Sequence, residues 1–142
     1  MNATILKFGY PATLVREFAH WVVLVRPAQV TLGSLVLAAK SDATAYGDLP
    51  PEAFTEQAAV IAAIEPGLKA FCGYERINYL MLMMVDTDVH FHVIPRYSGT
   101  REWGGLELAD RGWPGPPDLK SATDLSPSQT KGIRDELAKI FG

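Results

Sequence analysis

One long stretch of helical periodicity, flanked by strand-like segments on both sides, limits the folds open to this chain. Apolar residues recur at helical spacing from Phe54 to Phe71, after the Pro-Pro-Glu segment 50–52 and before Gly73. Proline and an acidic residue favour the first turn of a helix, and glycine favours its end. Pro66 inside the stretch predicts a kink or a division into two pieces. We therefore expect one long helix.

Two strand-like segments precede this helix. Residues 18–25 are rich in β-branched and aromatic side chains, and residues 35–39 form a second apolar run. Arg26 to Gln29 interrupts the pattern, and Gly33 is typical of a turn or a close backbone approach. The two segments are expected to pair as antiparallel neighbours.

Two more strand-like segments follow the helix. Residues 77–85 form a continuous apolar run, which predicts a central strand buried on both faces. Asp86 to Asp88 would make a turn, and residues 89–95 would return as the second strand of a hairpin. The Gly-, Pro- and Trp-rich region after Tyr97 predicts irregular structure, and a short amphipathic helix follows from Ser126.

Length and composition fit a single domain covering residues 1–142. With 142 residues, 48% of them hydrophobic and 20% charged, the chain can bury a core without disulfides or metal. Cys72 is the only cysteine, so no intramolecular disulfide can form. A buried helical thiol is the expectation for Cys72, and a single cysteine fits a reducing compartment.

The sequence does not favour a secreted, a membrane-spanning or a nucleic-acid-binding protein. The N-terminal residues have no basic start followed by a long apolar stretch, and no apolar run approaches the ~20 residues of a membrane span. The formal net charge is −3 and the basic residues are scattered, which does not favour a nucleic-acid partner. We expect a cytoplasmic protein with no membrane partner, in which a local site would meet any polyanion.

The segment 88–96 contains the main candidates for a functional site. On a strand, Asp88, His90 and His92 would share one face, whereas Phe91 and Val93 would point toward a core. Two of the chain's three histidines would therefore stand side by side on one sheet face. Incidental surface histidines are the structural alternative.

Two chemical interpretations compete for these histidines. A His-x-His pair can chelate a metal ion, but Asp88 and His92 would lie ~13 Å apart along a strand, and Arg96 adds a nearby positive charge. Alternatively, a neutral imidazole can attack phosphorus while a neighbouring histidine donates a hydrogen bond to a phosphoryl oxygen. A carboxylate at Asp88 would favour the protonated form of a nearby imidazole.

The same segment resembles the histidine-triad motif, in which histidines alternate with apolar residues. The resemblance is carried by His90 and by Phe91-His92-Val93-Ile94-Pro95-Arg96, and it extends over roughly residues 15 to 118. Supporting similarity lies in five further segments: His20–Leu24, Leu32–Leu37, Asp48–Glu52, Asn78–Met81 and Trp113–Pro116.

The resemblance implies an α+β, histidine-triad-like fold. Such a fold has an antiparallel sheet of about five strands, one long helix and a short C-terminal helix, usually in a homodimer. It also implies a hydrolase or nucleotidyl transferase that acts on dinucleoside polyphosphates or nucleotide conjugates. Neither a cofactor nor a metal is implied, and the expected partner is a nucleotide or dinucleotide substrate.

The resemblance also assigns roles by position. His90 matches the middle histidine, which is the nucleophile toward the α-phosphorus, and His92 matches the last histidine, which bonds phosphate oxygens. Asp88 occupies the place of the first histidine, so we include it among the catalytic candidates. Ser34 stands where many members have the histidine of a Gly-His pair, and it is a candidate substrate contact.

Other polar and aromatic residues have two interpretations each. Arg96 at the strand end either contacts phosphate or holds the chain by ion pairing, and Asn78 either contacts substrate or caps the backbone. Trp103 and Trp113 either wall a base pocket or pin the loop by packing, which is the more common role of loop tryptophans. His20 is expected to be a packed structural histidine.

Three functions follow from these alternatives. The first is hydrolysis of a nucleotide phosphoanhydride through a nucleotidyl-histidine. The second is a nucleotide-binding regulatory module whose catalysis has lapsed through the changes at Asp88 and Ser34. The third is a metal-dependent enzyme.

Overall fold

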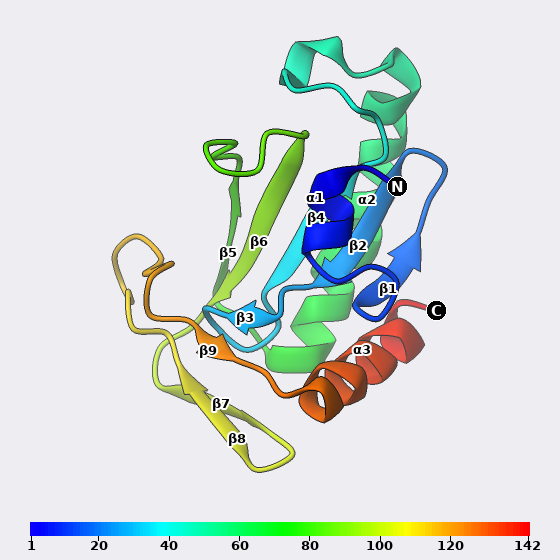
Figure 1. Cartoon of the computed structure of the whole chain (residues 1–142). Helices are drawn as coiled ribbons and strands as arrows, with labels where there is room; N and C mark the ends of the chain where they lie inside the picture. The colour runs from blue at the N-terminus through cyan, green and yellow to red at the C-terminus, as the bar shows by residue number, and fades with distance from the viewer.

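A five-stranded antiparallel sheet forms the centre of the structure, a computed structural model that describes residues 1–142 (Figure 1). The strand order is β1-β2-β4-β6-β5, and every neighbouring pair is antiparallel. The strands are β1 (Leu14–Glu17), β2 (Trp21–Val25), β4 (Leu35–Ala39), β5 (Arg76–Leu80) and β6 (His90–Arg96). The predicted pairing of the two segments that precede the helix is confirmed by β2 and β4.

Two small antiparallel ribbons accompany the sheet. One pairs β3 (Ala28–Gln29) with β9 (Thr123–Asp124), and the other is the hairpin of β7 (Thr100–Trp103) and β8 (Leu106–Ala109). The region after Tyr97 is therefore more ordered than its Gly- and Pro-rich sequence predicts. A tight turn at Gly104 and Gly105, both with positive φ, lets this hairpin form.

In addition to the strands, the structure contains three α-helices and one 3₁₀-helix. They are α1 (Ala3–Lys7), the 3₁₀-helix η1 (Tyr46–Asp48), α2 (Pro51–Cys72) and α3 (Pro127–Phe141). One long helix, a C-terminal helix and a five-stranded antiparallel sheet give the predicted α+β fold. No helix is both long enough and apolar enough to cross a lipid bilayer.

Helix α2 runs unbroken through Pro66, so the predicted division into two pieces is wrong. An internal proline costs a helix about 3 kcal/mol. Ile64 and Leu68, on either side of Pro66, are fully buried in the core, and Gly67 lies directly against Phe141 of α3. Packing on both sides of the proline therefore offsets its cost.

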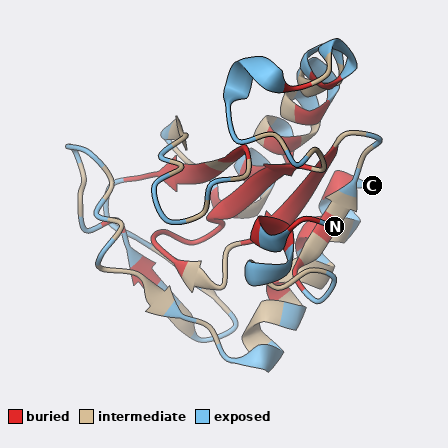
Figure 2. Ribbon diagram, turned by 45° about the horizontal axis from the view of Figure 1, so that its top comes forward, coloured by how far each residue is buried: buried red, intermediate tan, exposed pale blue.

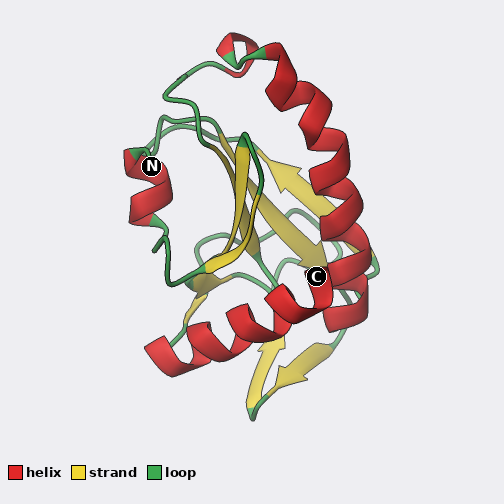
Figure 3. Ribbon diagram, turned by 90° about the vertical axis from the view of Figure 1, so that its right-hand side faces the viewer, coloured by secondary structure: helices red, strands yellow, loops and turns green.

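The sheet separates two layers of helices. Figure 3 shows α1 on one side of the sheet and α2 and α3 on the other. The larger core lies beneath α2 and α3, and the smaller core, which includes Ile5, Val22 and Val36, lies beneath α1. Buried residues concentrate in the strands of the sheet (Figure 2). Both faces of the central strands are covered, which explains their nearly continuous apolar sequences.

The segment after α2 differs most from its prediction. Strand β5 ends at Leu80 and is a half-buried edge strand, not a central strand buried on both faces. Residues 81–89 form a long connection to β6, in which Met84 and Val85 are each 83% exposed. The apolar character of this stretch therefore belongs to a loop surface and not to a strand.

Candidate functional site

Strand β6 presents both histidines to the face of the sheet that α1 covers. His92 pairs in register with Val36, and His90 pairs with Ala38. Val36 and Ala38 belong to the smaller core beneath α1, whereas Val93 belongs to the larger core beneath α2. The predicted alternation of β6 is confirmed, because paired residues of a sheet share a face.

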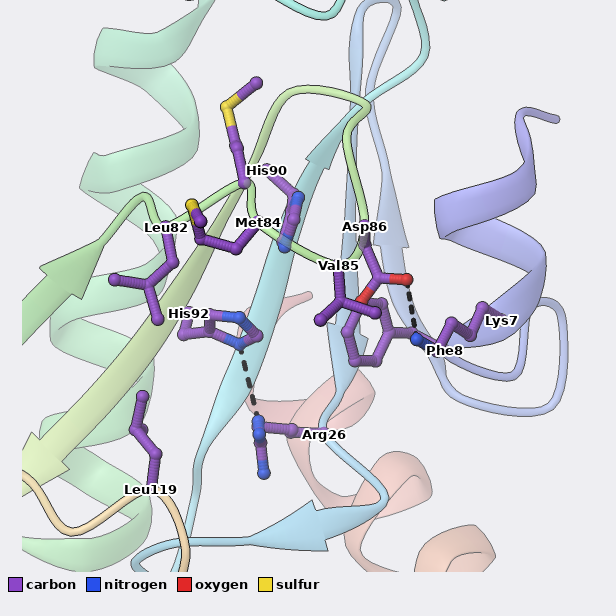
Figure 4. Close-up of a pocket in the computed structure, with 11 residues that line it drawn as sticks. Lys7, Phe8, Arg26, Leu82, Met84, Val85, Asp86, His90, His92 and Leu119 are labelled. Carbon is purple, nitrogen blue, oxygen red and sulfur yellow. Dashed lines mark hydrogen bonds and ion pairs between the residues drawn. The ribbon is translucent and has the colours of Figure 1, made fainter.

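A cavity of about 460 Å³ opens beside the two histidines (Figure 4). Its volume lies within the range of small-molecule sites. Its walls come from the C-terminal end of α1, the 81–89 loop, β6, Arg26 after β2 and the segment that precedes β9. The lining residues are Lys7, Phe8, Arg26, Leu82, Met83, Met84, Val85, Asp86, His90, His92 and Leu119.

The backbone holds the His90 ring. Its Nδ1 donates a hydrogen bond of 2.7 Å to the carbonyl oxygen of Asp88. A carbonyl can only accept, so the proton of the neutral ring resides on Nδ1 and Nε2 keeps a free lone pair. His90 is only 2% exposed, and its ring lies in the wall of the cavity. This histidine has the tautomer that a nucleophile or general base needs.

His92 has the opposite tautomer. Arg26 Nε donates a long hydrogen bond of 3.4 Å to His92 Nδ1 (Figure 4). A guanidinium can only donate, so Nδ1 is the unprotonated nitrogen and Nε2 carries the hydrogen. Burial lowers the pKa of His92 to about 4, and two smaller causes lower it further: the positive charge of Arg26, and the charge that His90 carries when it is protonated. At neutral pH this ring is therefore an uncharged hydrogen-bond donor.

The two imidazoles are close and nearly perpendicular. Their ring centroids lie 5.1 Å apart, and the interplanar angle is 84°. Because one ring offers a lone pair and the other an N–H, a single phosphoryl group between them can meet a nucleophile and a donor together.

Asp88 does not stand in line with the histidines, and this corrects the sequence prediction. Strand β6 begins at His90, so Asp88 lies in the preceding loop. Its carboxylate Oδ2 accepts hydrogen bonds from Thr4 Oγ1 at 3.0 Å and from the Thr4 N–H at 3.3 Å. The chain adopts strand geometry only from His90 onward, and the Asp88 side chain is directed to Thr4 of α1. The hydrogen bond between Asp88 and His90 is made by the backbone carbonyl of Asp88.

Ser34 does not line the cavity either. It is fully buried in the turn before β4, where its hydroxyl donates to the Thr31 carbonyl at 2.8 Å and accepts from the Thr31 N–H at 3.0 Å. Gly33 in the same turn has a φ of 95°, which a side chain would strain. Ser34 is therefore placed away from the histidine cavity, and its hydroxyl forms hydrogen bonds inside the turn.

Arg96 and Asn78 lie together, but they lie away from the histidine cavity. Arg96 binds both carboxylate oxygens of Asp110, at 2.7 and 3.1 Å, and donates to Asn78 Oδ1 at 2.8 Å and to the Gly115 carbonyl at 2.8 Å. These residues border a second cavity of about 420 Å³, beside Trp113. Of the two interpretations of Arg96, the structure shows ion pairing.

The remaining candidates of the sequence lie outside the histidine cavity. The backbone N–H of His20 donates to Glu56 at 2.7 Å. Trp103 lies against Gly132 of α3 and donates to Glu136, which is the loop-pinning role. No group of three or more His, Cys, Asp or Glu side chains is placed to hold a metal ion.

Sequence reasoning missed most of the cavity wall. The ring of Phe8, the C-cap residue of α1, lies 5.8 Å from the His90 ring and 5.9 Å from the His92 ring, between centroids. Lys7 forms an ion pair of 2.7 Å with Asp86 across the cavity rim. Because α1 and β6 are far apart in the sequence, no motif spacing predicts that they contact each other. Arg26, however, directly follows β2 on the same sheet. Its place at the end of a strand could have predicted that it lies near the histidines.

Comparison with solved structures identifies the fold. A histidine triad protein from Sinorhizobium meliloti superimposes with a TM-score of 0.75 at 18% identity, over 98% of this chain and 94% of that chain. One from Marinobacter aquaeolei gives 0.75 at 19% identity, over 99% and 94%. A hypothetical histidine triad nucleotide-binding protein from Sulfolobus tokodaii gives 0.72 at 15% identity, over 97% and 89%.

The chain therefore has the histidine-triad fold along its whole length, as the sequence resemblance implied. The sequence itself gives no match to a protein-family model or to a curated protein. At these low identities the likeness defines the fold, and the chemistry must be argued from the residues of this chain.

Proposed function

We propose that this protein is a nucleotidyl hydrolase or transferase that works through a covalent nucleotidyl-His90 intermediate. One observation carries the proposal: His90 and His92 face one cavity in complementary tautomers, each set by its Nδ1 partner. The histidine-triad fold supports it, and so does a structural neighbour described as nucleotide-binding.

In the first step, His90 Nε2 attacks the α-phosphorus of the substrate. A nitrogen–phosphorus bond forms as the bond to the leaving group breaks, and the leaving group takes the bonding electron pair. An amine leaving group also takes a proton from the solvent as it departs. The Nδ1 hydrogen bond to the Asp88 carbonyl stabilises the positive charge that develops on the ring. In the second step, water attacks phosphorus and passes a proton to the solvent, while the nitrogen–phosphorus bond breaks. Its electron pair returns to His90 Nε2, and the nucleoside monophosphate is released.

His92 and Arg26 serve the phosphoryl oxygens. Because His92 stays neutral with its hydrogen on Nε2, it donates to a non-bridging oxygen without first losing a proton. Arg26 adds a positive charge directly behind that ring. This charge stabilises the negative charge that the oxygens gain in the transition state.

The charges around the cavity favour a nucleotide conjugate with one phosphate over a dinucleoside polyphosphate. Two cationic side chains line the cavity, Lys7 and Arg26. Lys7 is already paired with Asp86, so Arg26 is the cation of the lining that has no ion pair. A polyphosphate chain carries several charges, and each would need a partner when it leaves water. Leu82, Met83 and the other apolar lining residues offer an uncharged wall for a base or an apolar leaving group.

The other candidates act as support in this proposal. Arg96, Asn78 and Ser34 hold the framework, since their polar groups are bonded within the fold. The homodimer that the resemblance implies stays a prediction, and sedimentation velocity of the purified chain tests it.

The decisive experiment is capture of the intermediate. The wild-type protein, mixed with a fluorogenic adenosine phosphoramidate and quenched in alkali, should carry one adenylyl group on the His90 peptide in mass spectra. His90→Asn should show no adduct and no turnover, while His20→Asn, which alters a histidine outside the cavity, should keep both. Turnover by His90→Asn at the wild-type rate would refute the assignment.

A nucleotide-binding module without turnover remains the second candidate, because the carboxylate of Asp88 is bound to α1 and not to the histidines. Binding of AMP without any adduct or turnover by the wild-type protein, across adenylated and guanylated substrates, would favour it.

A further inference from the structure

Helix α1 forms one wall of the histidine cavity, although it is too short to be stable alone. It contains five residues, and isolated helices shorter than ~12 residues are marginal in water. Its Phe8 end contacts both histidine rings, and Lys7 lines the cavity beside it. The position of this wall must therefore depend on contacts with the rest of the fold.

Three polar contacts fix α1 to the body of the protein. Asn2 caps the helix and also donates to the carbonyls of Ala39 and Ser41, at 2.9 and 3.0 Å. Lys7 pairs with Asp86, but the lysine side chain is 54% exposed, and exposed pairs contribute little. The third contact is the one between Thr4 and Asp88.

The Asp88 carboxylate satisfies the first turn of α1. Its Oδ2 receives the Thr4 backbone N–H, which no residue of the helix can accept at this position, and it receives the Thr4 hydroxyl as well. A negative charge at this end of a helix is also favourable. The same residue presents its carbonyl to His90 Nδ1, so one residue links α1 to the His90 ring.

We propose that Asp88 is a positioning residue that latches α1 over the site, and that Phe8 on this latched wall contacts the bound nucleotide. The inference rests on the proposed function and deepens it. In this arrangement Asp88, at the place of the first triad histidine, takes no part in proton transfer. It keeps the aromatic ring of Phe8 against the histidines, where a planar base or an apolar leaving group can pack.

A double-mutant cycle at Thr4 and Asp88 tests the latch. Thr4→Val removes one hydrogen bond to the carboxylate, and Asp88→Ala removes both. A hydrogen bond to a charged group contributes about 1.4 kcal/mol or more, which corresponds to about tenfold in an equilibrium. Hydrogen exchange of the amides of residues 5–8 should therefore accelerate about tenfold in Thr4→Val and more in Asp88→Ala. In the Asp88→Ala background, Thr4→Val should add nothing.

Steady-state kinetics separates positioning from catalysis. A loosened wall weakens binding, so both single variants should raise KM about threefold or more while kcat stays within about twofold. Phe8→Ala should raise KM similarly. Asp48→Ala, an exposed acidic residue on η1, provides the matched control and should change neither exchange nor KM.

The outcomes are distinct. A fall in kcat for Asp88→Ala with no effect of Thr4→Val would overturn the latch and assign Asp88 to the chemistry. Unchanged exchange of α1 in Asp88→Ala would also overturn it. If the wild-type protein shows no turnover, the proposed function fails, while the exchange cycle, repeated with AMP present, still decides whether Asp88 holds α1.

Discussion

The protonation of His92 gives a quantitative test of the site. Burial, together with Arg26 and His90, lowers the pKa of His92 from the ordinary value of 6.5 to about 4. Between these values the unfolded chain binds a proton at His92 and the folded protein does not. Acidification therefore favours the unfolded state, and stability is lost as the pH falls from 6.5 to 4. Above pH 6.5 the ring is neutral in both states and contributes no pH dependence.

The size of the effect follows from the shift. Each pKa unit corresponds to about 1.4 kcal/mol, so a displacement from 6.5 to about 4 amounts to about 3 kcal/mol. His92 is 8% exposed, so solvent screens little of this term. His92→Asn removes the titrating group and keeps an oxygen that Arg26 can reach. Its stability relative to wild type should therefore improve by about 2–3 kcal/mol between pH 7.5 and pH 4.5.

Urea unfolding, followed by tryptophan fluorescence to which the buried Trp21 contributes, measures this difference at the two pH values. The comparison between variants cancels the other titrating groups, and His20→Asn controls for the loss of a histidine elsewhere. Arg26→Met should raise the pKa of His92 only in part, because burial is the larger cause. Equal pH dependence in wild type and His92→Asn would refute the argument that His92 is held neutral.

Two further predictions concern residues outside the cavity. Arg96→Met should lower the free energy of unfolding by about 3–5 kcal/mol, because it leaves the buried Asp110 carboxylate without its cation. Thermal unfolding measures this loss. The double variant Arg96→Met with Asp110→Asn should recover part of the lost stability. Burial raises the pKa of the Cys72 thiol from 9 to about 11. Alkylation by iodoacetamide at pH 8 should therefore be about a hundredfold slower in the folded protein than in urea, because the thiolate is the reactive form. Equal rates would contradict this shift.

The fold could be predicted from the sequence because its signals are local. The proline and acidic start of α2, its stop at Gly73 and the runs of β2 and β4 all act over a few residues. The loop after Leu80 could not be predicted, because an apolar run looks the same in a buried strand and in the wall of a cavity.

The site could be predicted only as far as it lies on one strand. Alternation placed His90 and His92 on a common face, and the structure confirms this. Strand geometry failed at Asp88, because β6 begins two residues later and the side chain turns to Thr4. The contact between α1 and β6 joins segments more than eighty residues apart, and no periodicity encodes such a contact.

The chemical difference between the two histidines does not originate in the histidines. Both stand on β6, both are buried and both face one cavity. They differ because a carbonyl accepts from one Nδ1 and a guanidinium donates to the other, which fixes opposite tautomers. The carbonyl belongs to the backbone and survives any substitution at Asp88, whereas the guanidinium exists only while residue 26 is arginine. Replacing Arg26 would therefore change the tautomer of His92, whereas the side chain of Asp88 is not needed for the tautomer of His90 and instead binds Thr4.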